Sequence, residues 1–252
     1  MKKPFNLAVI GVVANISWAR EIPPNARAFY NRIKNDGCDD GVILQSGFYN
    51  GQRTSQNFSY CQDNSTKVIY IHTGSDFASM SVDCNGDQSD RGDGRCGSAQ
   101  ESYHQTYWKD IVEFYSKGKV FDVNTNFIPY VEFGNYAPEA SGTKFDPTQW
   151  GIQPLSVMAV ICGDKIVYGV WADVNLDSPP LIGRASLALA TECYGIAINE
   201  SEGHKENDVL YIAFSNAAED TVVRNAAWNA KSFKEFETSI SETGDLLVEK
   251  LF

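Results

Sequence analysis

Six cysteines constrain the fold of this 252-residue chain more than any other feature of its sequence. They are Cys38, Cys61, Cys84, Cys96, Cys162 and Cys193. An even number of cysteines is typical of a disulfide framework when the chain enters an oxidising compartment, and it leaves many pairings open. We favour Cys84–Cys96 for its short span and Cys162–Cys193 because it ties a predicted hairpin to the segment after it. Cys38–Cys61 then remains by elimination.

Residues 1–19 have the order of features found in a secretory signal peptide. Lys2 and Lys3 come first, residues 5–13 are mostly apolar, and Ser17-Trp18-Ala19 is a small-x-small cleavage site. The alternative, an N-terminal strand or buried helix, explains this order less well. We therefore expect residues 20–252 to form the extracellular domain. The apolar run is too short to span a membrane, and no later run reaches that length.

The chain is acidic, with 32 Asp and Glu residues against 21 Lys and Arg residues. Such a charge repels nucleic acid and attracts a cationic ligand such as an amine-bearing polysaccharide, although it also simply favours solubility. No C-x-x-C pair is present, and the three histidines lack metal-ligand spacing. Asp83, Asn85 and Asp87 begin like a calcium loop, but the glycine and glutamate that such a loop requires are missing. We expect a monomer with no metal, no cofactor and no nucleic-acid or membrane partner.

Apolar residues at helical spacing predict three helices, from stripes at 26–33, 103–115 and 233–240. Pro24 and Gly37 bound the first, Gly118 stops the second, and a capping box of Ser232 and Glu235 begins the third. We interpret the aromatic rings of these stripes as core contacts and not as ligand sites. Segments rich in Val, Ile, Tyr and Phe predict strands at 42–48, 67–73, 127–133, 155–162, 165–173 and 208–214.

Two of these strands, 155–162 and 165–173, are joined only by Gly163-Asp164. Glycine at the first central position suits a type II′ hairpin. Strands at this density, with few helices and no internal repeat, predict a single domain that is mainly β, disulfide-bonded and built on a β-barrel-like core.

The second hairpin strand places an aromatic ring and a carboxylate on one face. Side chains alternate along a strand, so Trp171 and Asp173 share a face and lie roughly 7 Å apart. This pair fits a sugar-binding platform beside a catalytic base, which makes Trp171 a candidate substrate-binding residue. The competing interpretation is a buried Trp171 beside an Asp173 that caps the following turn, and local pattern alone favours it.

The stretch 151–175 reads GIQPLSVMAVICGDKIVYGVWADVN, and it resembles the central block of the fungal endo-chitosanases of glycoside hydrolase family 75. The resemblance continues through GRASLALATEC at 183–193 and NDVLYIAF at 207–214. Upstream, MSVDCNG at 80–86 and FIPYVEFGN at 127–135 also match. All six cysteines fall at matching places. The resemblance spans nearly all of the chain after the signal peptide.

This resemblance implies a secreted enzyme that hydrolyses β-1,4 bonds within chitosan, with inversion at the anomeric carbon. The family uses two carboxylates, an Asp that Asp173 matches and a Glu that opens a Glu-Ala-Ser-Leu tract. An inverting enzyme needs one carboxylic acid to protonate the leaving oxygen and one carboxylate to activate water, roughly 6.5–9.5 Å apart. Asp173 is therefore the first candidate catalytic residue.

The second position departs from the family, because Arg184 stands before Ala-Ser-Leu where the family has Glu. Arginine stays protonated and can act as neither acid nor base. Asp177 lies in the loop before it, and this loop is about two residues longer than in the relatives. Among nearby carboxylates Asp177 is the best candidate substitute, since Glu192 is too far along the chain to replace Glu directly.

Three functions fit these observations. The first is an active or weakly active endo-chitosanase, the second a non-catalytic chitosan-binding protein that kept the groove and lost the acid, and the third a secreted interaction protein with no carbohydrate role. The third fits worst, because Trp171 and Asp173 remain in their tract. We favour the first, impaired because of Arg184, with chitosan or another glucosamine-containing polysaccharide as its partner.

Overall fold

The computed structural model describes residues 20–38, 41–54, 57–74, 76–87, 89–90, 92–97, 105–136, 143–215 and 220–251. The predicted signal peptide at 1–19 lies outside the described residues, and so does Tyr103 at the start of the predicted second helix. Within the described ranges, no helix is long and apolar enough to cross a membrane.

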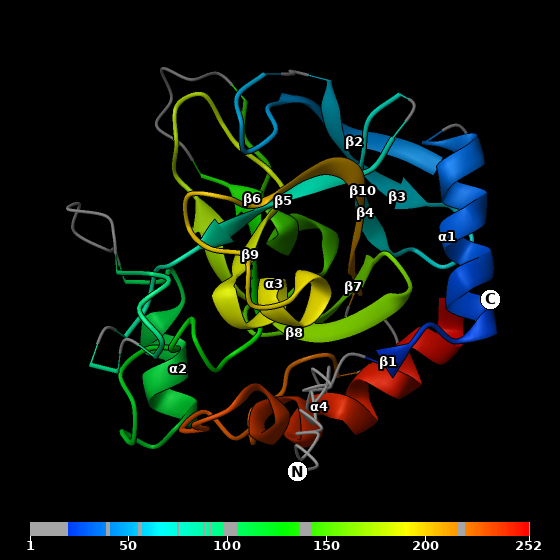
Figure 1. The fold of residues 1–252 in the computed structure, drawn as a ribbon. Helices are drawn as coiled ribbons and strands as arrows, with labels where there is room; N and C mark the ends of the chain where they lie inside the picture. The colour runs from blue at the N-terminus through cyan, green and yellow to red at the C-terminus, as the bar shows by residue number, and fades with distance from the viewer. Residues whose placement is uncertain are drawn as a thin grey trace, which may run out of the picture.

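The structure is built around a ring of six strands (Figure 1). Going round the ring, β8 pairs with β6, β6 with β9, β9 with β5 and β5 with β10, and β7 joins β10 back to β8. The pairs β5–β9 and β6–β8 are parallel, and the other pairs of the ring are antiparallel. The strands β4, β3 and β2 extend the sheet beyond β10, and β1 pairs with β8. This architecture agrees with the predicted mainly β domain with a ring-like core.

The described strands have the following bounds: β1 Arg20–Glu21, β2 Gly41–Phe48, β3 Phe58–Asp63, β4 Ile69–His72, β5 Ala78–Asp83, β6 Tyr130–Asn135, β7 Val157–Cys162, β8 Lys165–Asn175, β9 Arg184–Ser186 and β10 His204–Ala213. The predicted strands correspond to β2, β4, β6, β7, β8 and β10, and the sequence did not indicate the other four. At the turn between β7 and β8, Gly163 takes a positive φ of 58°, as the predicted type II′ hairpin requires.

The described helices are α1 (Pro24–Asp36), α2 (Lys109–Tyr115), α3 (Leu187–Tyr194) and α4 (Phe233–Val248), with 3-10 turns η2 (Pro147–Trp150) and η3 (Glu249–Leu251). The predicted first and third helices are α1 and α4, and Ser232 caps α4 by accepting a hydrogen bond from the N–H of Glu235. The predicted second helix is too long, because α2 begins only at Lys109. The prediction that the aromatic rings of this segment are core contacts is also wrong in part, since Phe114 is 77 % exposed and Tyr107 is 45 % exposed.

Both faces of the ring strands are buried, and alternate residues enter two hydrophobic clusters. In β7, Val157, Ala159 and Ile161 belong to a cluster with apolar residues of α1 and α4. The intervening Met158 and Val160 belong to a second cluster, with apolar residues of α3. Figure 1 shows α4 along the lower side of the ring and α1 at its right. Helical cover on the strand faces leaves little of the sheet to solvent, so polar side chains inside it need a specific reason.

Three disulfides join Cys38 to Cys61, Cys84 to Cys96 and Cys162 to Cys193, and no described cysteine is free. This confirms the favoured pairing. The Cys162–Cys193 bond links the end of β7 to α3, and the Cys84–Cys96 bond follows directly after β5. The Cys84–Cys96 bond also lies beside the candidate active site, because Cys84 lines its cavity.

Candidate active site

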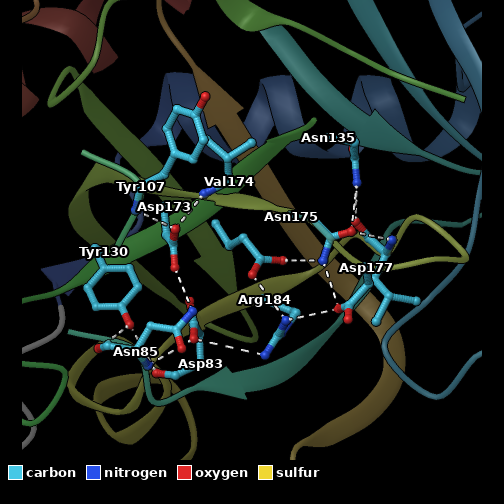
Figure 2. Close-up of polar contacts among 12 residues, drawn as sticks. Asp83, Asn85, Tyr107, Tyr130, Asn135, Asp173, Val174, Asn175, Asp177 and Arg184 are labelled. Carbon is cyan, nitrogen blue, oxygen red and sulfur yellow. Dashed lines mark hydrogen bonds and ion pairs between the residues drawn. The ribbon is translucent and has the colours of Figure 1, made fainter. Parts of the chain in front are cut away.

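Asp173 lies near the end of β8, and three donors hold its carboxylate (Figure 2). The backbone N–H groups of Tyr107 and Val174 each donate to Oδ1 at 2.8 Å, and Asn85 Nδ2 donates to Oδ2 at 2.8 Å. The residue is only 3 % exposed. These hydrogen bonds fix the orientation of the carboxylate.

The N–H of Tyr107 reaches Asp173 because the segment before α2 is held from its other side. Thr106 donates to the buried carboxylate of Asp122 through both its backbone N–H, at 2.9 Å, and its Oγ1, at 2.5 Å. The backbone of the next residue is thereby fixed against β8. The ring of Tyr107 is left partly exposed, beside the carboxylate that its backbone binds.

Three neighbouring strands present Asp173, Glu132 and Arg184 side by side. In the parallel pair β6–β8, Glu132 lies opposite Asp173, and in the antiparallel pair β6–β9 it lies opposite Arg184. Adjacent strands are about 4.8 Å apart, and opposed residues project from the same face of the sheet. Glu132 is therefore the neighbour of both residues, and positions 173 and 184 flank it.

Gly183 determines where β9 begins and so where Arg184 lies. Its φ is +76°, and a Cβ atom at this position would lie 2.6 Å from the backbone oxygen of Ser79. Only glycine fits this close approach. The oxygen of Gly183 accepts a hydrogen bond from the N–H of Ser81 at 2.8 Å, which brings Arg184 opposite Ser81 on β5.

The guanidinium of Arg184 is paired with carboxylates (Figure 2). Its Nη1 lies 3.1 Å from Glu132 Oε2 and 3.3 Å from Asp177 Oδ2, and its Nη2 lies 3.9 Å from Asp83 Oδ1. Asn175 Nδ2 bridges the same carboxylates, donating to Glu132 Oε1 and to Asp177 Oδ2 at 3.0 Å each. Arg184 is thus the positive centre of an otherwise acidic group.

Asp83, Glu132 and Asp173 form a buried carboxylate cluster, in which one oxygen of each residue lies within 4.8 Å of the others. Such a donor set suits a hard divalent cation. Here the guanidinium of Arg184 already lies against two of the three carboxylates. Their charges, that of Glu132 first, raise the pKa of Arg184 even further, so the side chain stays charged. We therefore assign the positive charge of this cluster to Arg184 and not to a metal.

These groups line one cavity with a volume of about 810 Å³, within the size range of ligand sites. Five carboxyl groups and three basic side chains line it, and those not yet named are Arg53, Glu200 and Lys205. The structure thus brings Asp173, Asp177 and Arg184, the candidates found in the sequence, into a single cavity.

Burial changes the protonation of two of these carboxyl groups. It raises the pKa of Asp173 well above its usual value, and the charges of Asp83 and Glu132 add to this effect. Burial also raises the pKa of Glu132 from 4.5 to about 8, although the charge of Arg184 opposes the shift. With a pKa of about 8, Glu132 keeps its proton at neutral pH, which is the property that a general acid needs.

The raised pKa of Glu132 predicts how stability depends on pH. Below about pH 4.5 the group is protonated in both the folded and unfolded states; between there and pH 8 only the folded state keeps the proton. Since a raised folded-state pKa gives stability that is lost as the pH rises, the melting temperature should fall across this window. Thermal melts from pH 4.5 to 8 should show a shallower fall for Glu132→Gln. The matched control Glu242→Gln, an exposed position on α4, should melt like the wild type, and equal slopes for all three proteins would contradict the assignment.

The structure corrects the expectation that Trp171 is a sugar-binding platform. Its side chain is 0 % exposed and makes a T-shaped contact with Trp108, with ring centroids 5.2 Å apart. Its Nε1 donates to the backbone oxygen of Asp173 at 3.0 Å. A sugar cannot stack on a ring buried in this way. Trp171 instead supports Asp173 from inside the core.

Asp177 does reach the cavity, although the sequence could not establish this. Its carboxylate pairs with Arg184 and also lies 3.7 Å from the guanidinium of Arg53. Its side chain is 36 % exposed and lines the cavity. Glu192 is on α3 and does not line this cavity.

Four residues of the site were not recognised in the sequence: Asp83, Asn85, Tyr107 and Glu132. A usable signal existed for Glu132, because it is a lone charged residue inside the apolar strand segment FIPYVEFGN. Charged residues are rarely buried without partners, so a Glu at such a position points to a functional or paired group. No comparable signal identified Asn85 or the backbone of Tyr107.

Comparison with known proteins identifies the family. The profile described as fungal chitosanase of glycosyl hydrolase group 75 matches residues 80–250. The chain belongs to this family. An endo-chitosanase of Aspergillus oryzae is 38 % identical over 238 residues, which cover 92 % of this chain and 93 % of the relative. An endo-chitosanase of Aspergillus fumigatus is 36 % identical, with 92 % of each chain covered, and endo-chitosanase B of A. oryzae is also 36 % identical, with the same coverage.

The part of the chain that matches the group 75 chitosanase profile contains the whole carboxylate cluster. Asp83, Glu132, Asp173, Asp177 and Arg184 all lie between residues 80 and 250. So does the Cys84–Cys96 disulfide. Most of the cavity lining therefore lies within the matched residues, and Gly51, Gln52 and Arg53 are the lining residues outside them.

Proposed function

We propose that this protein is an endo-chitosanase that cleaves β-1,4 bonds inside chitosan chains with inversion, and that hydrolysis depends on Asp173. The observation that carries the proposal is the position of Asp173, which matches the catalytic Asp of the family and lines a cavity with five carboxyl groups. Chitosan carries amino groups, which can donate hydrogen bonds to the carboxyl groups that line the cavity. The relatives named above are endo-chitosanases.

The strand order supports inversion as the outcome at positions 173 and 184. These positions lie on β8 and β9, the two neighbours of β6, so their backbones are roughly 10 Å apart. A Glu at 184 would thus be placed for the carboxyl separation of roughly 6.5–9.5 Å that an inverting pair needs to hold a water. Glu132 is too near Asp173 for that role, with carboxyl oxygens within 4.8 Å.

Arg184 makes the proposed enzyme an impaired one. It occupies the position of the second carboxylate, and it can neither give nor accept a proton in the reaction. We propose Asp177 as the substitute where hydrolysis does occur, because it is held beside Arg184 and is partly exposed to the cavity. Asp177 would then supply the second carboxyl group of the reaction, which Arg184 cannot provide.

The proposal is tested by incubating the purified protein with soluble, largely deacetylated chitosan. We expect a fall in viscosity that precedes the rise in reducing ends, as internal cleavage requires, at a rate well below that of the A. oryzae relative. Proton NMR of early products should show the α-anomer, because inversion of a β bond gives α. Early β-anomer would contradict inversion, and the absence of new reducing ends at any enzyme concentration would contradict the assignment as a hydrolase.

A second function is favoured by one observation, the pairing of Arg184 with Glu132 and Asp177. A cleft whose carboxylates are neutralised in this way could bind chitosan without cleaving it. Retention of the protein on a chitosan column, together with no hydrolysis, would distinguish this binding protein from the enzyme.

We also infer that the protein is secreted and acts as a monomer. The three disulfides support export, because such bonds form and persist in oxidising compartments. The signal-like residues 1–19 agree with it.

A further inference from the structure

A second cavity has a volume of about 410 Å³. Residues of β2, of the end of β6 and of η2 line it. Its lining combines an indole ring, an amide side chain and a carboxylate, supplied by Trp150, Gln149 and Asp146. Trp150 is 39 % exposed, in contrast to the buried Trp171. A few polar groups around a partly exposed aromatic ring are typical of a ligand site.

Asp146 lines this cavity, and its two carboxylate oxygens differ in the number of hydrogen bonds that they accept. Its Oδ1 accepts hydrogen bonds from the Tyr136 hydroxyl at 2.7 Å, from the Thr148 N–H at 2.9 Å and from Thr148 Oγ1 at 2.6 Å. Among the described residues, its Oδ2 has a single long contact, 3.5 Å from Gln149 Nε2. Partial burial alone would raise the pKa of Asp146, but the hydrogen bonds from Thr148 and Tyr136 outweigh it and lower the pKa, so the group stays ionised. Oδ2 is thus the oxygen with capacity left for a ligand donor.

Two tyrosines connect this cavity with the acidic one. Tyr136 lines the second cavity and Tyr107 lines the acidic cavity, and their ring centroids are 5.2 Å apart. The N–H of Tyr136 donates to the backbone oxygen of Asn175 at 2.9 Å, which fixes it to the end of β8. The two cavities are therefore neighbours, with the Tyr107–Tyr136 pair between them.

We propose that the second cavity binds a glucosamine unit of the chain that occupies the acidic cleft, with Trp150 against the sugar and Asp146 Oδ2 accepting from its ammonium group. The inference rests on the proposed function and extends it to a subsite outside the cleft. An ammonium group is attracted both by an ionised carboxylate and by the face of an indole. Lys144 also lines this cavity, so the preference for an amine arises from the placement of Asp146 and Trp150 and not from net charge.

Binding of glucosamine oligomers to the Asp173→Asn protein, which should not cleave them, tests this subsite. By calorimetry, affinity should rise from the trimer to the hexamer, because only the longer chain spans both cavities. Trp150→Ala should weaken hexamer binding by about 3- to 30-fold and leave trimer binding unchanged. The matched control Phe114→Ala removes another exposed ring, on α2, that lines neither cavity, and it should bind as the reference protein does.

A second readout follows the indole N–H signal of Trp150 by NMR, assigned by its loss in Trp150→Ala. The signal should shift on titration with the glucosamine hexamer and remain in place with the fully acetylated hexamer. Hexamer binding that is insensitive to Trp150→Ala, with an unmoved Trp150 signal, would overturn the subsite alone. An equal shift with the acetylated hexamer would overturn the selection of an amine. Failure of every oligomer to bind the reference protein would instead overturn the proposed function.

Discussion

Replacing Asp173 with asparagine is expected to reduce chitosan hydrolysis by about 10²–10⁴-fold, because an amide cannot exchange a proton with the reacting groups. The fold should persist, since the asparagine oxygen can accept the hydrogen bonds that Tyr107 and Val174 now donate to Oδ1. The side-chain amide of Asn85 can turn to meet the new NH₂ group. Chitosan binding, measured by calorimetry, should therefore survive the loss of turnover.

The matched control for this experiment is Asp110→Asn. Asp110 is on α2, its side chain is 84 % exposed, and it does not line the cavity. This variant should cleave chitosan at the wild-type rate. If Asp173→Asn also cleaves at that rate, the catalytic carboxylate has been misplaced. If it loses binding as well as turnover, Asp173 holds the cavity together and its chemical role is unsupported.

Replacing Arg184 with glutamate should have the opposite effect, a rise in hydrolysis of about 10²-fold or more, because it restores a second carboxylate where the family has it. Arg184→Gln serves as the control, since it removes the same positive charge but cannot transfer a proton. Initial rates of reducing-end formation on soluble chitosan will separate the two variants. Equal rates for both would show that a proton-transferring group is not what the wild type lacks.

The gain at position 184 should come with a loss of stability. Arg184 pairs with Glu132, Asp83 and Asp177, and removing one partner of such a buried group leaves the other charges uncompensated. We expect Arg184→Glu to melt several degrees below the wild type at neutral pH. The rate comparison should therefore be made well below the melting temperature of each variant.

Asp177→Asn decides between two accounts of any activity in the wild type. If Asp177 has taken over the role of the missing Glu, this substitution should abolish the remaining hydrolysis. If Asp177 only neutralises Arg184, the rate should change little. A fully active wild type that neither Arg184→Glu nor Asp177→Asn affects would mean that the second carboxylate lies elsewhere in the cavity.

Much of the framework could be predicted from the sequence, because it follows from local patterns. The stripe of Ala26 to Ile33 is long and bounded by Pro24 and Gly37, and it forms α1. The disulfide pairing was open in principle, and the short span of Cys84–Cys96 together with the hairpin that contains Cys162 proved a sufficient guide. The missed strands β5 and β9 pair with strands distant in the sequence, and β9 has only three residues, so nothing local marks them. The missed helix α3 is apolar on most sides and lacks the one-sided stripe of a surface helix.

The candidate site was predicted less completely than the framework, for a reason visible at Trp171. Alternation along β8 predicts one shared face for Trp171 and Asp173, but the pairing with β6 is irregular between them, so that Trp171 lies opposite Val131 and Asp173 opposite the next residue, Glu132. No local pattern marks this irregularity. The strand is buried as far as Trp171 and meets the cavity only at its end. Glu132 and Asp83 meet Asp173 through the order of the strands in the ring, and that order depends on pairings which no local pattern contains.

The location of the Cys84–Cys96 bond links the chemistry of this cleft to the conditions in which the protein is made. Cys84 lines the cavity between Asp83 and Asn85, the residue that holds Asp173. A thiol reductant that opened this bond would free one wall of the cavity while most of the ring of strands remained in place. Chains produced in a reducing cytosol could therefore have normal secondary structure and a poorly formed cleft, so activity should be judged only on material whose oxidation state has been established.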